Sequence, residues 1–192
     1  MKKLVLASTS PRRKELLGLI LKLWPQQSFE CVSPDIDETQ WNNETPAELV
    51  ERLAVEKAEA GQKLVEDIKA CVIGSDTIVV IDGQVLGKPT DEADAKAILR
   101  RLSGETHQVL TAVAMVQEYS YYSHVVSTQV QFSQLSDEDI DAYVASGEPM
   151  DKAGAYGIQG IGGTFVEKIS GSHSAVIGLP MAETQDLLKQ IL

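Results

Sequence analysis

The chain has 192 residues, long enough for one domain with a sizeable core, and its 43% hydrophobic and 23% charged residues are typical of a globular protein. A formal net charge of −11 argues against a nucleic-acid-binding protein, which usually carries a basic face. The N-terminal apolar run is too short for a signal peptide, and no run reaches the roughly 18 apolar residues of a membrane-spanning helix. The two cysteines, Cys31 and Cys71, lack metal-ligand spacing and lie in apolar runs, so we expect buried free thiols in a reducing cytoplasm.

The N-terminal residues predict a strand, a small polar loop and a helix. Residues 4–7 form a short apolar run, and Pro11 stands at the first helical position behind Ser10, a residue type that favours the N-cap. A second strand is expected at 28–32, followed by an acidic, turn-rich loop at 34–43. The chain therefore opens with alternating strands and helices, as α/β proteins do.

The central part carries a capping box and a hairpin signal. Thr45-Pro46-Ala47-Glu48 is the capping box, with proline at the first helical position, so a helix is expected behind it. A strand at 71–74 ends in Gly-Ser-Asp-Thr. The next two strands, 78–81 and 85–86, flank Asp82-Gly83, a strong signal for a two-residue hairpin turn.

Long strands gather in the remainder of the chain, among three further helices. The elements expected there are a helix at 90–102 with an apolar face at Ala93, Ala97 and Ile98, strands at 109–116 and 125–132, a helix at 136–146, a glycine-rich loop at 147–163, a strand at 165–169 and a helix at 179–192. This order predicts an α/β fold with a mixed twisted sheet and flanking helices, in a single domain over residues 1–192.

The loop Ser8-Thr9-Ser10-Pro11-Arg12-Arg13 is the first candidate site. A strand that leads into a helix N-terminus presents unpaired backbone N–H groups and the positive end of the helix dipole, which together attract phosphate. The hydroxyls add donors, and Arg12 or Arg13 can bind phosphate oxygens through two hydrogen bonds. Taken alone, the stretch favours an ordinary capped helix with solvated arginines, and it lacks the Gly-Lys-Ser/Thr ending of a Walker A loop.

Asp76 and Lys88 are the next candidates. Asp76 follows a hydrophobic strand at its C-terminal end, where open α/β sheets bind ligands, and its carboxylate can hold a divalent metal or accept a proton from an attacking water. A simple turn aspartate is an equally good interpretation. Lys88 follows the hairpin and returns toward Asp76, where an ammonium can neutralise phosphate charge, although a solvated loop lysine is favoured when it is taken alone.

Two more segments carry weaker signals. The acidic residues Asp35, Asp37 and Glu38 offer the hard oxygen ligands that Mg²⁺ or Mn²⁺ prefers, against the alternative of solvated charge. Residues 152–160 place small residues around one tyrosine and Gln159, which indicates backbone close to a ligand, against the alternative of a flexible loop. The three histidines lie far apart in the sequence, so a covalent nucleophile would lack a base.

Each signal is weak alone, but their order along the chain resembles the Maf family of nucleoside triphosphate pyrophosphatases. The matching segments run from residue 4 to about 184 and are 7–13, 37–38, 52–54, 56–58, 74–77, 87–89, 102–104 with His107, 153–160 and 176–180. One departure is Ser172-His173-Ser174, where relatives often carry an aromatic residue after Gly-Ser.

The resemblance implies a fold like that of inosine triphosphate pyrophosphatases, with two lobes around a cleft, and hydrolysis of a nucleoside triphosphate to the monophosphate and pyrophosphate. It also implies a divalent cation (Mg²⁺ or Mn²⁺), a cytoplasmic location and a homodimer. Asp76 matches the family's proton acceptor. The positions tied to substrate choice are Arg12, Thr77 and Gln159, and the other polar positions of the cleft correspond to Ser8, Arg13, Glu38, Lys57 and Lys88.

Thr77 and Gln159 resemble the branch that acts on dTTP and UTP more than the branch that acts on 7-methyl-GTP. A glutamine amide both accepts and donates, so it can meet two adjacent atoms of uracil or thymine, whereas a glutamate only accepts. We expect Glu38 and Asp76 to hold the metal, Asp76 to take a proton from water, and Lys88 with the N-terminal loop to hold the triphosphate. The alternative is a nucleotide-sensing regulator of cell division, since the family's name is linked to septum inhibition.

Overall fold

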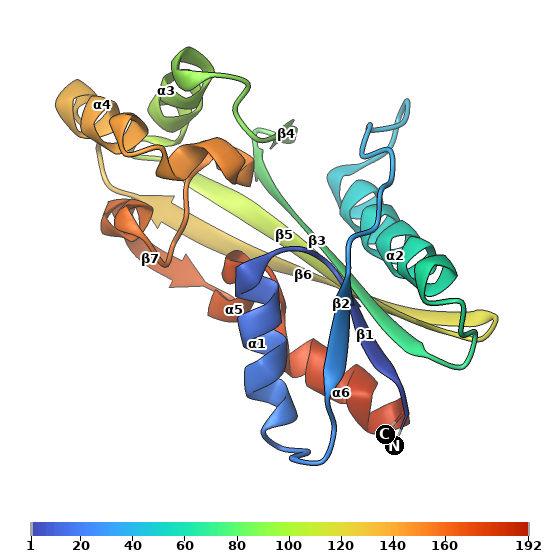
Figure 1. The fold of residues 1–192 in the computed structure, drawn as a ribbon. Helices are drawn as coiled ribbons and strands as arrows, with labels where there is room; N and C mark the ends of the chain where they lie inside the picture. The colour runs from blue at the N-terminus through green and yellow to red at the C-terminus, as the bar shows by residue number, and fades with distance from the viewer. Residues whose placement is uncertain (1, 192) are drawn as a thin grey trace. The chain divides into compact units, whose positions relative to one another are not determined.

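The computed structural model describes residues 2–191, which fall into two compact units. Unit 1 takes the described residues of 1–76, 111–126 and 178–192, and unit 2 takes 77–110 and 127–177. Their strands belong to a seven-stranded sheet with the order β2-β1-β3-β5-β6-β7, and β4 pairs with β3 (Figure 1). Parallel pairs of β1 with β2 and β3, and antiparallel pairs β3–β4 and β6–β7, make the sheet mixed, which confirms the predicted fold class.

The elements of the described residues follow the predicted order closely. They are β1 (Leu4–Ala7), α1 (Pro11–Leu21), β2 (Phe29–Val32), α2 (Pro46–Val65), β3 (Cys71–Ile81), β4 (Gln84–Leu86), α3 (Glu92–Leu102), β5 (Thr106–Gln117), β6 (Ser120–Phe132), α4 (Asp137–Ala145), the 3₁₀ helices η1 (Glu148–Asp151), η2 (Ala153–Ala155) and η3 (Ile161–Phe165), then β7 (Val166–Ser170), α5 (His173–Ile177) and α6 (Met181–Ile191).

Local capping chemistry starts the first two helices where the sequence predicts. The Ser10 hydroxyl accepts a hydrogen bond from the Arg13 backbone N–H, and Pro11 occupies the first turn of α1. Thr45 and Glu48 form the reciprocal capping box of α2. These contacts satisfy backbone donors that a helix start leaves unpaired, so both helix boundaries are set by nearby residues.

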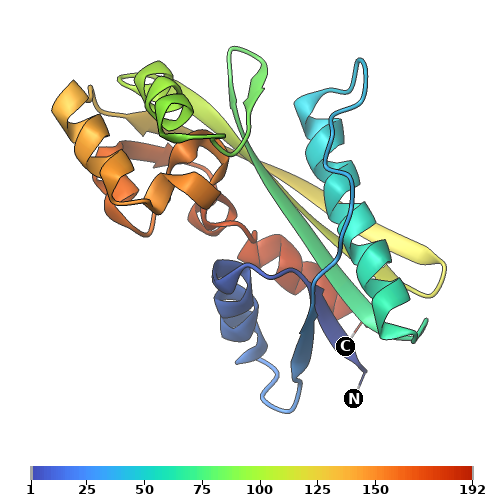
Figure 2. The same ribbon diagram turned by 45° about the horizontal axis from the view of Figure 1, so that its top comes forward.

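Small residues let α2 pack closely on the sheet of unit 1. A Cβ on Gly74 of β3 would lie 2.1 Å from the Ala54 carbonyl oxygen of α2, and a Cβ on Gly61 would lie 2.7 Å from the Ala7 side chain of β1. In both ribbon views α2 lies on one side of β1 and β3, and α1 and α6 lie on the other (Figures 1 and 2). The glycines therefore bring the backbone of α2 directly against the strands.

The core of unit 2 contains an aromatic cluster. Phe132 contacts the rings of His107, Tyr156 and Phe165 edge to face, with centroids 5.0, 4.7 and 6.0 Å away. Burial lowers the pKa of His107 to about 4, so this histidine is neutral at physiological pH, and its Nε2 lies 2.8 Å from the Tyr156 hydroxyl. His107 is therefore a structural residue of unit 2.

The structure corrects the predicted break in β3. Residues 71–81 form one continuous strand, so Asp76 lies in its middle and not at a C-terminal end. Gly74 and Ser75 are typical turn residues, but here the glycine admits α2 and the Ser75 hydroxyl hydrogen-bonds to the carbonyl oxygens of Ala112 and Gly178. Both residues make contacts with parts of unit 1 that are distant in the sequence. A local sequence pattern does not reveal such contacts.

Three smaller expectations are also wrong. The buried face of α3 is Ala95, Leu99 and Leu102, whereas the face expected at Ala93, Ala97 and Ile98 is exposed or only partly buried. The glycine-rich stretch 147–163, expected to be a loop, contains the 3₁₀ helices η1 and η2 and the start of η3. Cys31 is exposed because β2 is an edge strand, while Cys71 is buried and burial raises its pKa to about 12.

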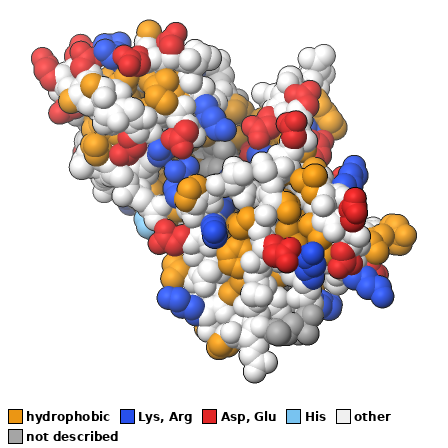
Figure 3. All heavy atoms as spheres, in the orientation of Figure 1, with side chains coloured by type: hydrophobic (Ala, Val, Ile, Leu, Met, Phe, Trp, Pro, Cys, Tyr) orange, Lys and Arg blue, Asp and Glu red, His pale blue; other side chains and the backbone are white. Residues whose placement is uncertain are grey.

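The surface carries both signs of charge. On the face drawn in Figure 3, acidic and basic side chains are interspersed over both units. Among residues 2–191, none of the helices is both long enough and apolar enough to cross a membrane.

Candidate active site

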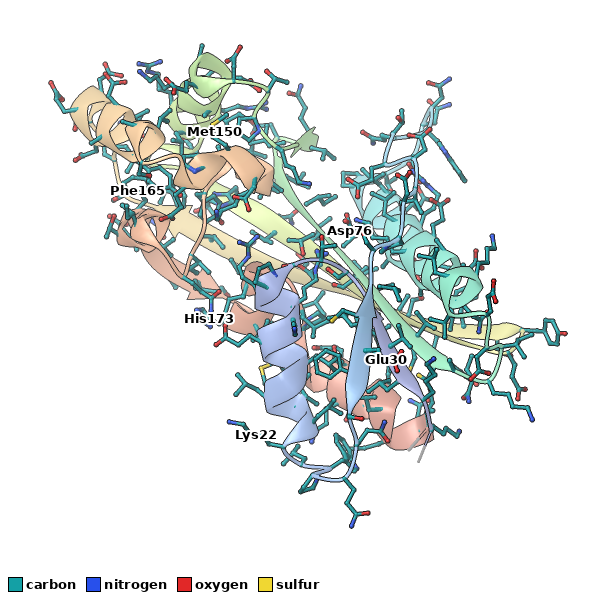
Figure 4. The ribbon with its side chains drawn as sticks, viewed as in Figure 1. Lys22, Glu30, Asp76, Met150, Phe165 and His173 are labelled. Atoms are coloured by element: carbon teal, nitrogen blue, oxygen red, sulfur yellow. The ribbon has the colours of Figure 1, made fainter. Side chains whose placement is uncertain are left out.

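Asp76 is placed by the alternation of β3. Successive side chains of a strand point to opposite faces of the sheet, so Ser75 and Asp76 face different layers of unit 1. Ser75 points toward the segment that leads into α6, where its hydroxyl meets the Gly178 carbonyl oxygen at 3.0 Å. Asp76 points toward α2 and is only 7% exposed (Figure 4). A buried carboxylate of this kind requires a charged or hydrogen-bonding partner.

Lys57 of α2 supplies that partner and joins two predicted site residues. Its ammonium lies 2.7 Å from Asp76 Oδ1 and 2.6 Å from Glu38 Oε1. The Lys57 and Asp76 side chains are 12% and 10% exposed, whereas the Glu38 side chain is about half exposed. The two carboxylates therefore converge on one cation, and the Asp76 carboxylate is buried whereas the Glu38 carboxylate is exposed to solvent.

The loop that carries Glu38 is fastened to α2 by Arg52. The Arg52 guanidinium donates to the Thr39 carbonyl oxygen at 3.0 Å, pairs with Glu44 at 2.6 Å, and lies 4.0 Å from the centre of the Trp41 ring. Thr39 in turn donates its backbone N–H to the Asp37 carboxylate. Arg52 thus fixes the residue after Glu38 directly and the residue before it through Thr39, and this positioning role was not assigned from the sequence.

The N-terminal loop forms the predicted strand-to-helix turn. Ser8 is buried, and its hydroxyl oxygen accepts a hydrogen bond from the Ser10 backbone N–H at 3.1 Å. Ser10 caps α1, and Arg12 and Arg13 lie in the first turn of that helix. The first turn of α1 therefore combines its backbone N–H groups with two arginine residues, which are the groups that an anion-binding site uses.

Arg13 is partly buried in unit 1 and anchored to the segment before α6. Its Nε donates to the Gly178 carbonyl oxygen at 2.8 Å. The pKa of Arg13 lies below its ordinary value, mainly because burial lowers it. The negative charge of Asp76 opposes this effect, and smaller influences come from Arg12, which lowers the pKa, and Glu38, which raises it. Arg13 shares the Gly178 carbonyl oxygen with the hydroxyl of Ser75, which directly precedes Asp76 in β3. With the charges of Asp76 and Glu38 acting on it, the charged Arg13 belongs to the same electrostatic cluster as the Glu38–Lys57–Asp76 bridge.

Lys88 and Gln159 belong to unit 2. Lys88 is exposed and follows Gly87, whose carbonyl oxygen accepts a hydrogen bond from the Gly154 backbone N–H at 3.0 Å. Gly154 has a φ of +70°, and a Cβ there would lie 2.7 Å from the Val79 side chain. Within unit 2 the lysine segment and the glycine-rich segment are therefore joined through their backbones, and only glycine fits at the junction.

Gln159 stands exposed in the glycine-rich segment, between Ile158 and Gly160. Thr77 is partly buried in β3 and belongs to unit 2, although its neighbour Asp76 belongs to unit 1. Unit 1 thus gathers Ser8, Arg12, Arg13, Glu38, Lys57 and Asp76, and unit 2 carries Thr77, Lys88 and Gln159.

Known proteins resemble this chain over nearly its whole length. The family described as Maf-like protein matches residues 3–191. The chain belongs to the Maf family. Within that family it is 58% identical over 188 residues to a dTTP/UTP pyrophosphatase of Shewanella oneidensis, with 97% of each chain covered. It is also 53% identical over 192 residues to a dTTP/UTP pyrophosphatase of Vibrio vulnificus, with both chains fully covered.

A solved structure supports the fold. The HAM1 protein of Coxiella burnetii superposes with a TM-score of 0.55 at 17% identity, covering 99% of this chain and all of the other. At that identity the likeness shows the architecture alone. The Maf-family chain therefore shares its mixed α/β architecture with the HAM1 protein.

The carboxylates present fit a divalent cation. Among residues 2–191 the structure contains no group of three or more Asp, Glu, His or Cys side chains that could enclose a metal. Mg²⁺, however, usually binds through one or two carboxylates together with water and substrate phosphates. The convergent pair Glu38 and Asp76 provides that number and kind of ligand.

Proposed function

We propose that this Maf-family chain hydrolyses dTTP and UTP to the nucleoside monophosphate and pyrophosphate, with both units acting as one domain over residues 1–192. The observation that carries the proposal is the pair of carboxylates, Glu38 and Asp76, held on the Lys57 ammonium within the electrostatic cluster that includes Arg13 of the α1 N-terminal turn. Phosphate groups need such a cationic, donor-rich site, and attack by water needs a proton acceptor beside it.

Each residue has a distinct task in the proposed reaction. Asp76 accepts a proton from the attacking water at its carboxylate, and Lys57 offsets the repulsion between that carboxylate and Glu38. The start of α1, with Ser8 and Arg13, binds the triphosphate oxygens. Lys88 neutralises the charge that develops on the leaving pyrophosphate.

Glu38 and Asp76 are the residues that would hold Mg²⁺ or Mn²⁺. A bound cation supplies charge neutralisation to the phosphate oxygens. We expect pyrophosphate release to stop after dialysis against EDTA and to return with Mg²⁺ or Mn²⁺. Calorimetric titration of Mn²⁺ into the apo protein and into Glu38→Gln gives a readout apart from activity, and equal affinities would refute this ligand assignment.

Substrate choice is assigned to Arg12, Thr77 and Gln159. The exposed Gln159 amide can accept from the N3–H of uracil or thymine and donate to an adjacent carbonyl. Gln159→Glu leaves only acceptors, so kcat/KM for UTP and dTTP should fall while their ranking against GTP changes. An unchanged ranking would refute this assignment.

The central test is pyrophosphate release over a panel of nucleoside triphosphates. We expect dTTP and UTP to be cleaved fastest, and Asp76→Asn to lower kcat by at least about 100-fold, the usual scale of general-base catalysis. Asp35→Asn, an exposed carboxylate of the same acidic loop, is the matched control and should retain wild-type rates. Wild-type rates in Asp76→Asn would refute the role of this residue. Nucleotide binding without turnover in the wild-type chain would favour the regulator of cell division.

We also propose a homodimer in the cytoplasm. Light scattering at micromolar concentration tests the first expectation, and fractionation of the native host cells tests the second. A monomer at all concentrations would refute the dimer.

A further inference from the structure

Glu148 of unit 2 accepts three hydrogen bonds with one carboxylate. The backbone N–H of Ile161 donates to Oε2 at 3.0 Å, and the backbone N–H of Gly162 donates to Oε1 at 3.1 Å. The Tyr143 hydroxyl also donates to Oε1, at 3.0 Å. Neither Glu148 nor Tyr143 is among the site residues that the sequence indicates, and yet both contact the segment that carries Gln159.

Tyr143 holds the other side of the same segment. Its hydroxyl oxygen accepts a hydrogen bond from the Gly157 backbone N–H at 3.2 Å. Tyr143 is carried by α4 and is 1% exposed, and its ring packs edge to face on Phe165 (labelled in Figure 4) with the centroids 5.0 Å apart, so the ring is fixed within the core of unit 2. The Tyr143–Glu148 pair therefore binds the backbone two residues before Gln159 and again two and three residues after it.

The Tyr143–Glu148 pair leaves no room for a side chain at two glycines of the segment. A Cβ on Gly160 would lie 2.4 Å from both carboxylate oxygens of Glu148, and a Cβ on Gly162 would lie 2.6 Å from the Tyr143 hydroxyl. Such distances exclude any larger residue unless the pair moves. The backbone beside Gln159 thus lies directly on the two side chains, with no intervening layer.

The pair is also electrostatically suited to hold backbone donors. Burial raises the pKa of Glu148, but hydrogen bonds from Ile161, Gly162 and Tyr143 and the charge of Lys152 together lower it below its ordinary value. Glu148 is therefore ionised at neutral pH, and charge-assisted hydrogen bonds are stronger than neutral ones. The Lys152 ammonium donates to the Glu148 carbonyl oxygen at 2.6 Å, which fixes the start of η1.

We propose that Glu148 and Tyr143 are positioning residues that hold Gln159 in the orientation required to select the pyrimidine base. This inference rests on the proposed role of Gln159 in substrate choice. Fixing the backbone on both sides of an exposed side chain lowers the entropy lost when that side chain binds its ligand. Glu148 and Tyr143 act through Gln159 and do not themselves touch the substrate.

The experiment compares Tyr143→Phe and Glu148→Gln with the wild type over UTP, dTTP, CTP and GTP. Tyr143→Phe keeps the ring and removes two hydrogen bonds, and Glu148→Gln sets an amide N–H₂ against backbone donors. We expect KM for UTP and dTTP to rise about tenfold with kcat changed less than about twofold, because base recognition without a chemical role is uniform binding. KM for CTP and GTP should change less than about twofold.

Two further variants separate positioning from a merely structural role. In a Gln159→Ala background, Tyr143→Phe should have no additional effect on KM, since residues that act through one side chain are not additive. Thr128→Val removes a buried hydroxyl of unit 2 that makes two hydrogen bonds with Ser172, and it should leave all KM values unchanged. Hydrogen exchange should show faster exchange of the Gly157 amide in Tyr143→Phe than in the wild type.

The outcomes distinguish this inference from the proposed function. If Gln159→Ala changes the nucleotide ranking and neither Tyr143→Phe nor Glu148→Gln does, the positioning role is wrong and the proposed function stands. Additive effects in the double variant, a parallel loss of kcat for all four nucleotides, or the same shift in Thr128→Val would also overturn it. If Gln159→Ala leaves the ranking unchanged, both the role of Gln159 and the positioning role are wrong.

Discussion

Gly74→Ala tests how closely α2 must lie on β3. The added Cβ would stand 2.1 Å from the Ala54 carbonyl oxygen and 2.7 Å from the Ala58 backbone nitrogen. Both are backbone atoms that cannot rotate away, so the helix must retreat by roughly 1 Å to reach an acceptable contact. Overpacking of this kind costs about 1–3 kcal/mol, and we expect the upper end because the whole helix has to move. The melting temperature should then fall by roughly 6–12 °C in a chain of this size.

The same displacement should reach the candidate site. Lys57 precedes Ala58 on α2, and its ammonium lies 2.7 Å from Asp76. Moving the helix by roughly 1 Å weakens this ion pair, and misplacement on that scale lowers turnover by up to about 100-fold. Thermal unfolding by circular dichroism and pyrophosphate release are measured on the same preparation. Gly18→Ala is the control, since a Cβ there has no neighbour within 4 Å and should stabilise α1 by about 0.5–1 kcal/mol. Equal melting temperatures for Gly74→Ala and wild type would refute the close-packing argument.

Three other changes probe the bridge, the aromatic core and the junction of unit 2. Lys57→Met removes the cation shared by two carboxylates and should lower the unfolding free energy by about 3 kcal/mol, measured in urea at pH 7. His107 has its pKa lowered to about 4 by burial, and the unfolded chain takes up the proton first, near pH 6.5. The unfolding free energy should therefore fall by about 3 kcal/mol from pH 7 to pH 4, and His107→Phe should lose that part of the dependence. Gly154→Ala combines a φ of +70° with a Cβ 2.7 Å from Val79, and should lower the melting temperature more than Gly147→Ala, where φ is +77° but the space is open.

Features with a nearby cause were predictable from the sequence. Ser10 and the Thr45 capping box begin their helices because the partners lie three residues away. Asp82 and Gly83 both adopt positive φ, 51° and 73°, and form the expected hairpin turn between β3 and β4. For the two helix starts, a short sequence pattern contains both the donor and the acceptor of the capping hydrogen bond. For the hairpin, it contains the two residues that tolerate positive φ.

Features whose cause lies far away in the sequence could not be predicted from it. Gly74 and Ser75 resemble a turn, but their contacts lie on α2 and up to 103 residues along the chain, so only the folded unit shows that β3 continues through them. Glu148 bonds to backbone N–H groups 13 and 14 residues away, and no local pattern marks a carboxylate that accepts from backbone. The Arg52 contacts with Thr39 and Trp41 are likewise invisible in the motif that contains Arg52.

The hydrogen bond from Arg13 to the Gly178 carbonyl oxygen spans 165 residues, and it affects how the protein can be made. A ribosome adds the arginine 165 residues before it adds the acceptor. While those intervening residues are synthesised, the nascent chain therefore carries a charged side chain that lacks its native partner, and all of unit 2 is made in that interval. The first unit to begin is the last to be completed, so truncated products that end before residue 178 lack the closing segment of the unit that carries Asp76.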